Sequence, residues 1–146
     1  VSPSLNGFKP TQQPPYISDL ITALQEGDYD QANEVLLASS IMSVPSDSKK
    51  LVREMVVSSN QWKLAYELME QNPEPIVKNL DRIEIPTLIL LGENDGQAVT
   101  ELGEFLLDEM PNADLEVIPD GRHLLNLSHP KEFNTALQNF VEPQQK

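Results

Sequence analysis

The chain has 146 residues and carries 23 Asp and Glu side chains against 10 Lys and Arg side chains, which gives a formal net charge of −13. A surface this acidic repels phosphate backbones and anionic lipids, so we expect neither nucleic acid nor a membrane as a partner. The absence of cysteine excludes disulfides and thiolate metal sites, and no apolar run approaches the roughly 18 residues of a membrane span.

The first 78 residues predict a connector followed by a small helical unit. Residues 1–16 contain four prolines among Ser, Asn, Gly and Gln, which is typical of an extended connector. Apolar residues at helical spacing then predict successive helices, with stripes of Ile17, Leu20, Ile21 and Leu24; Ala32, Val35 and Leu36; Leu51, Val52, Met55 and Val56; and Trp62, Ala65 and Met69. Gly27 ends the first helix, and Asp28 can cap the second with Gln31 three residues on. We expect the methionines and the tryptophan of these stripes to pack in the unit rather than to line a pocket.

A buried strand is predicted next, over Thr87 to Leu91. Five consecutive apolar or β-branched residues, closed by Pro86 before and Gly92 after, indicate a strand covered on both faces, as in a parallel sheet. Such a strand delivers Asp95 just beyond its carboxyl end, where open α/β sheets assemble their sites.

The segment that follows predicts a return helix, a second strand and a last helix. An apolar stripe of Leu102, Phe105, Leu106 and Met110 marks the return helix, and residues 115–118 form the core of the strand-like run that ends at Pro119. Pro130 opens the last helix, whose core-facing stripe is Phe133, Ala136, Leu137, Phe140 and Val141. We expect residues 143–146 to be a frayed polar tail.

An acid after one strand and a histidine after the next form a candidate acid and base pair. Asp95 lies in a Gly-rich turn, where an aspartate commonly bonds only its own backbone. His123 follows the second strand in Gly121-Arg122-His123, and taken alone it is also compatible with a surface histidine. We expect His129, which precedes Pro130, to be such a surface residue.

At this point the chain resembles the C-terminal segment of an α/β-hydrolase. Gly92-Glu93-Asn94-Asp95 fits the Gly-x-x-Asp turn that carries the acid in that family, and Gly121-Arg122-His123 with Pro130 seven residues later fits the histidine segment. The order of acid then histidine also matches. The resemblance implies an α/β fold with two parallel strands and flanking helices from the C-terminal part of the sheet, with Asp95 and His123 as catalytic acid and base. It divides the chain into a connector (1–16), a helical cap (17–78), the C-terminal part of the core (79–142) and a tail (143–146).

One part of the family pattern is missing: the sequence contains no Gly-x-Ser-x-Gly, so neither the nucleophile nor the oxyanion loop is present. Val1 to Ser4 resembles the end of the core strand that precedes the cap, and we expect the chain to be part of a longer protein. The resemblance implies a hydrolase of an ester or similar small carbonyl substrate, inactive as this chain alone and paired with an N-terminal half or a second copy. The alternative is a non-catalytic binding fragment or pseudo-enzyme of the same fold.

We expect neither a cofactor nor a metal, and a cytoplasmic location. The residues from Asp28 to Ser39 begin like a calcium loop but have Asn33 and Ser39 in place of the required Gly and Glu. His123 and His129 are six residues apart and so cannot share one helical face, which argues against a zinc pair.

Overall fold

The computed structural model describes residues 7–59 and 76–142. The predicted fourth helix over 60–72, with Trp62 and Met69, lies outside these residues, as do residues 1–6 and the tail. Within the described ranges, no helix combines the length and apolarity needed to cross a bilayer.

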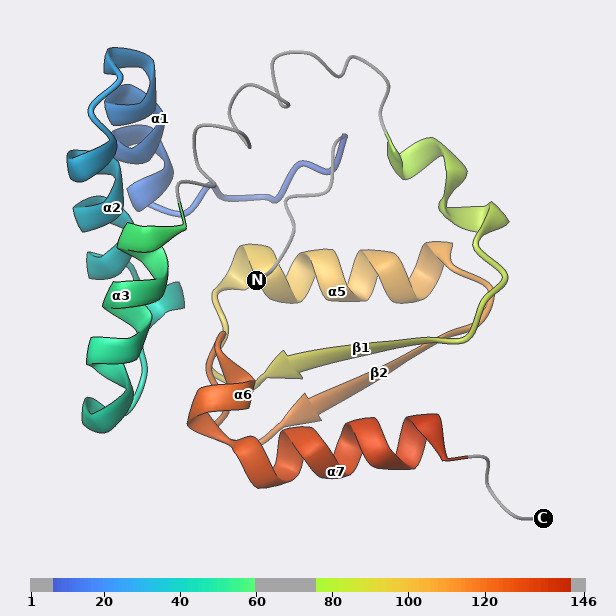
Figure 1. Ribbon diagram of the computed structural model, residues 1–146. Helices are drawn as coiled ribbons and strands as arrows, with labels where there is room; N and C mark the ends of the chain where they lie inside the picture. The colour runs from blue at the N-terminus through green and yellow to red at the C-terminus, as the bar shows by residue number, and fades with distance from the viewer. Residues whose placement is uncertain (1–6, 60–75, 143–146) are drawn as a thin grey trace.

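The N-terminal half contains the three described helices that the sequence predicts. They are α1 (Tyr16–Glu26), α2 (Tyr29–Ala38) and α3 (Lys49–Ser58), and they lie together at one side of the molecule (Figure 1). The connection between α2 and α3 holds two short 3-10 turns, η1 (Ser40–Met42) and η2 (Ser46–Ser48). We refer to residues 16–58 as the helical unit.

The junction between α1 and α2 follows from local sequence signals. Gly27 ends α1 with φ of 72°, a left-handed conformation that glycine adopts without a steric penalty. The next amide, that of Asp28, reaches back to the Ala23 carbonyl oxygen at 2.9 Å. The Asp28 carboxylate then accepts the Gln31 backbone N–H at 2.9 Å, as the predicted cap requires.

The buried stripes of these helices are narrower than predicted. Leu20 and Ala23 of α1 pack with Ala32 of α2, whereas Ile21 is exposed. In α3 the side chains of Val52 and Val56 are buried, but Leu51 and Met55 are exposed, and Met55 has 57% of its surface accessible. The prediction that Met55 packs inside the unit is therefore wrong for the described residues, because the contacts of α3 form on one edge of its stripe only.

The C-terminal half is a parallel two-stranded sheet between two helices. Strand β1 (Thr87–Gly92) pairs with β2 (Ala113–Ile118) in the register Thr87 opposite Ala113 to Gly92 opposite Ile118. Helix α5 (Gln97–Glu109) covers one face of the sheet and α7 (Pro130–Val141) the other (Figure 1). Two further elements were not predicted: the 3-10 segment η3 (Ile76–Arg82) before β1 and the one-turn helix α6 (Leu125–Ser128) before α7.

Apolar surface remains open around this sheet. In β1 only Leu91 and Gly92 are buried. The prediction of a strand covered on both faces is therefore correct only for the carboxyl end of β1. In α7 only Ala136 is buried, while Leu137, Phe140 and Val141 of the predicted core-facing stripe are exposed. Two strands with one helix on each face are too small a unit to bury all of these side chains.

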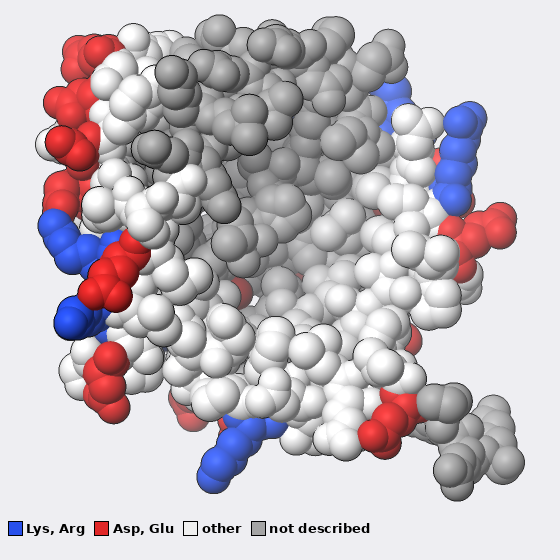
Figure 2. Space-filling model, viewed as in Figure 1, with Lys and Arg blue, Asp and Glu red and all other residues white. Residues whose placement is uncertain are grey.

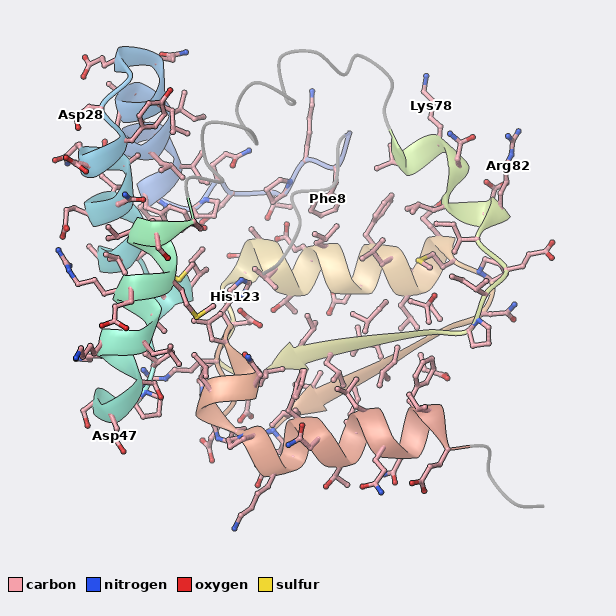
Figure 3. The ribbon with its side chains drawn as sticks, in the orientation of Figure 1. Phe8, Asp28, Asp47, Lys78, Arg82 and His123 are labelled. Atoms are coloured by element: carbon pink, nitrogen blue, oxygen red, sulfur yellow. The ribbon has the colours of Figure 1, made fainter. Side chains whose placement is uncertain are left out.

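The described part of the connector lies along α5. The rings of Phe8 and Phe105 have centroids 5.2 Å apart, and Figure 3 shows Phe8 above that helix. The Thr11 backbone N–H donates to Glu101 at 2.7 Å, and the Thr11 hydroxyl donates to the same carboxylate. These bonds, together with one from Gln97, hold the pKa of Glu101 below its ordinary value. The connector therefore links the helical unit to the sheet layer through specific contacts.

Acidic side chains dominate the outline of the molecule. On the face seen in Figure 2 most of the charged side chains lie around the periphery, and most of the described atoms nearer its centre belong to uncharged residues. The predicted repulsion of polyanions follows from this excess of negative charge and stays a prediction.

Candidate active site

Asp95 lies in the tight turn that connects β1 to α5. Its backbone N–H donates to the Gly92 carbonyl oxygen at 2.9 Å, which closes the turn at the end of the strand. Its carboxylate oxygen Oδ2 accepts the Gly92 N–H at 3.3 Å, so the side chain folds back over the strand end. This is the local hydrogen bond expected of an aspartate turn former, yet it occupies only one of the two carboxylate oxygens.

His123 lies in the short segment between β2 and α6. We call residues 121–124 the histidine loop; it has no regular secondary structure. Figure 3 shows His123 beyond the carboxyl ends of the strands, on the side toward the helical unit.

Asp95 and His123, the predicted acid and base, are in direct contact. The second carboxylate oxygen of Asp95, Oδ1, lies 2.7 Å from Nδ1 of His123, which is the distance of a strong hydrogen bond. Only 3% of the Asp95 side chain and 7% of the His123 side chain are exposed. Because a carboxylate only accepts hydrogen bonds, Nδ1 is the nitrogen that carries the proton, and the Asp95 contact thereby selects the imidazole tautomer.

Two glycines make this meeting possible. Two hydrogen bonds join the turn after β1 to the segment after β2: the Asn94 N–H donates to the Gly121 carbonyl oxygen at 2.8 Å, and the Asp120 N–H donates to the Glu93 carboxylate at 2.9 Å. At this junction the backbones of Gly92 and Gly121 touch: a Cβ added at Gly92 would lie 2.5 Å from the Gly121 carbonyl oxygen and 2.7 Å from the Arg122 nitrogen. The sequence motifs contain both glycines, but the motifs alone did not reveal that they face each other.

A cavity of about 410 Å³ opens next to the pair. Asp95, His123 and Asn126 supply its polar groups, and apolar side chains of β1, α5, α6 and α7 line it as well, among them Ile89, Leu91, Leu102, Leu106, Leu125 and Phe133. A hollow that combines apolar side chains with a few convergent polar groups is a usual form of a small-molecule site, but this one also lies beside the edge of β1 that pairs with no described strand.

The other candidates contribute nothing to this pair. Nδ1 of His129 lies 3.1 Å from the Ser128 hydroxyl oxygen, at the start of α7, and the side chain is not at the Asp95 carboxylate. Residues 29–38, which make up most of the weak calcium-loop match, form α2. Among the described residues, no three His, Asp or Glu side chains gather in an arrangement that could hold a metal ion.

Comparisons with known proteins agree with this architecture. No family model matches the chain. It is 28% identical over 122 residues to the pimeloyl-[acyl-carrier protein] methyl ester esterase of Chromobacterium violaceum, a match that covers 82% of this chain and 48% of that protein. It is 33% identical over 63 residues to the serine hydrolase BPHL of Mus musculus, covering 43% of this chain and 22% of that protein.

Solved structures give the same result for the fold. A thermophilic esterase superposes on the chain with a TM-score of 0.63 at 26% identity, covering 85% of this chain and 49% of the esterase. The chain thus spans less than half the length of each curated relative and about half of the solved structure. The chain is identified as the C-terminal portion of an α/β-hydrolase fold, and the relatives named here are hydrolases.

Proposed function

We propose that Asp95 and His123 are the acid and base of a Ser-Asp-His catalytic triad. The observation that supports this most is the buried 2.7 Å contact between Asp95 Oδ1 and His123 Nδ1 at the carboxyl ends of two adjacent parallel strands. The nucleophilic serine and the oxyanion hole would come from a polypeptide segment outside these 146 residues, since the sequence has no Gly-x-Ser-x-Gly.

In this role each residue has a defined task. With Nδ1 protonated and bonded to Asp95, Nε2 of His123 is the nitrogen that takes the proton of the serine hydroxyl as it attacks a carbonyl carbon. The Asp95 carboxylate stabilises the imidazolium that forms, and the imidazolium then returns its proton to the leaving group. Water hydrolyses the acyl-enzyme by the same steps.

The substrate class that we propose is an ester or a similar small carbonyl compound. The printed activity of one relative, a methyl ester esterase, supports it. The helical unit would serve as the cap over this site, because it lies next to the carboxyl ends of the strands (Figure 1).

We further propose that the open edge of β1 receives the rest of the sheet. Within the described residues β1 pairs only with β2, and apolar residues of β1 and α5 line the hollow beside its free edge. An unpaired, apolar strand edge is a template for another strand. The occupant would be an N-terminal half of the fold or, less favoured by the charge of −13, a second copy of this chain.

The test uses the intact protein that carries this chain together with a Gly-x-Ser-x-Gly segment. Asp95→Asn and His123→Ala are each expected to lower kcat for a short activated ester by about 10⁴-fold, because triad members act in the chemical step. His129→Ala is the matched control and should leave the rate unchanged, with all three variants melting near the parent temperature. If His123→Ala retained the rate of His129→Ala, the fold would be serving a non-catalytic, binding role.

A second test uses the 146-residue chain alone. We expect it to have no triad-dependent esterase activity, since it lacks both the nucleophile and the oxyanion donors. Ester turnover by the purified chain that disappears in His123→Ala would contradict this expectation, whereas a background that survives the substitution would agree with it.

A further inference from the structure

The residues on either side of His123 both contact the helical unit. Arg122, which is exposed, donates a hydrogen bond through Nη1 to the Ser43 hydroxyl in the connection between η1 and η2. Leu124 packs, together with Leu127 of α6, against the apolar core of the helical unit, which consists of Leu36, Val44, Val52 and Val56. The histidine loop is therefore bounded by the helical unit both before and after the imidazole.

The first residue of the histidine loop, Gly121, is hydrogen-bonded to the sheet and to the turn that carries Asp95. The Gly121 carbonyl oxygen accepts the Asn94 N–H at 2.8 Å, and the Gly121 N–H donates to the Ile118 carbonyl oxygen at 3.1 Å. These bonds fix the start of the loop relative to the Asp95 turn. The residues that bring His123 back toward Asp95 come after Gly121, and that is the stretch in contact with the helical unit.

We infer that Arg122 is a positioning residue, which uses Ser43 of the helical unit to hold the His123 imidazole against Asp95. This inference rests on the proposed function of the pair and deepens it. The Arg122–Ser43 bond and the Leu124 contact fix the backbone on both sides of His123. A movement of the helical unit relative to the sheet would therefore also move the His123 imidazole. The unit thereby contributes to proton transfer as well as to covering the site.

The expected effect is on the chemical step. A misplacement of the reacting groups by about 1 Å can cost on the order of 10²-fold in rate. Removal of one hydrogen bond that orients the loop is expected to lower kcat about tenfold, with KM changed by less than about twofold.

The experiment is carried out on the intact protein that carries the triad serine, with five variants. Arg122→Ala removes the donor of the hydrogen bond and Ser43→Ala removes its acceptor. If both act through this one bond, the double variant should lose no more kcat than either single variant. Arg122→Lys keeps a donor and should recover most of kcat. Arg53→Ala is the matched control, because Arg53 is also an exposed arginine but pairs with Glu34 inside the helical unit.

Two readouts are measured: kcat and KM for a short activated ester, and the NMR signal of the His123 Nδ1–H proton, whose exchange with solvent we expect the buried contact with Asp95 to slow. The inference predicts a lower kcat and faster exchange of this proton in Arg122→Ala and Ser43→Ala, no further loss in the double variant, and parent values in Arg53→Ala. If Arg122→Ala unfolds the protein, Ser43→Ala carries the test, since it leaves the histidine loop unaltered.

Parent values of both readouts in Ser43→Ala and Arg122→Ala would overturn the inference. Failure of the proposed function looks different: His123→Ala would then keep its activity. The exchange of the Nδ1–H proton tests the positioning role independently of any turnover.

Discussion

The junction of Gly92 and Gly121 allows a quantitative prediction for Gly92→Ala. The added Cβ would lie 2.5 Å from the Gly121 carbonyl oxygen and 2.7 Å from the Arg122 nitrogen, whereas ordinary contact begins near 3.4 Å. The nearest atom of all is the Gly121 carbonyl carbon, so a separation of about 1 Å must open between the β1 turn and the histidine loop. These neighbours are all backbone atoms, so no side chain can rotate away to make room.

The cost of this separation falls in the range of core overpacking, about 1 to 3 kcal/mol of unfolding free energy. In the intact protein that corresponds to a melting temperature lower by about 2 to 12 °C. The same separation moves Asp95 relative to His123, so a decrease in kcat of the intact protein approaching 10²-fold is expected as well.

Thermal unfolding followed by circular dichroism measures the first quantity. Gly96→Ala is the matched control, because a Cβ at Gly96 meets no atom within 4 Å and its φ of −69° suits alanine. That substitution should cost less than about 1 kcal/mol, the usual penalty for alanine at a helix N-cap. Equal melting temperatures for the two variants would refute the steric reasoning, and the close backbone contact with it.

Two further predictions concern the connector and the open sheet edge. Because the pKa of Glu101 is lowered in the folded protein, the contribution of its carboxylate to stability is present at neutral pH and is lost as the pH falls through that lowered pKa. Thr11→Ala should raise the pKa of Glu101 toward its ordinary value, and an NMR titration of the Glu101 carboxyl carbon measures this change. An unmoved titration would show that Thr11 does not hold Glu101. The isolated 146-residue chain should self-associate through the edge of β1, and sedimentation across concentration and salt checks this; a compact monomer with cooperative melting and no dye-binding apolar surface would contradict it.

The elements with strong local signals could be predicted from sequence. Gly27 and Asp28 were expected to end α1 and cap α2, and the structure shows both. The strand from Thr87 was predicted to within one residue, because Pro86 and Gly92 bracket a continuous apolar run. These signals act over one or two turns of chain, so they need no knowledge of the neighbours.

Burial could not be predicted as well, because it depends on what packs against each stripe. The α7 pattern predicted a core-facing stripe through Val141, yet 73% of that residue is exposed. Helical periodicity states which side chains share a face, and whether that face is covered is decided by the other elements. The same limit applies to Leu51 and Met55 on α3. Arg122 was likewise not singled out, because its partner Ser43 is 79 residues away in the chain.

The contact between Asp95 and His123 depends on how β1 and β2 pair, which the sequence pattern does not determine. Spacing placed both residues just after strands, but spacing alone does not fix the register between those strands. In the structure Gly92 is opposite Ile118, so the two turns start at the same level of the sheet. A slip of one residue would displace one turn by about 3.3 Å along the strand and reverse the faces of its side chains. That displacement exceeds the whole 2.7 Å contact between Oδ1 and Nδ1. The acid and base pair is therefore a product of the register, and the touching backbones of Gly92 and Gly121 lock that register at the end of the sheet where the pair forms.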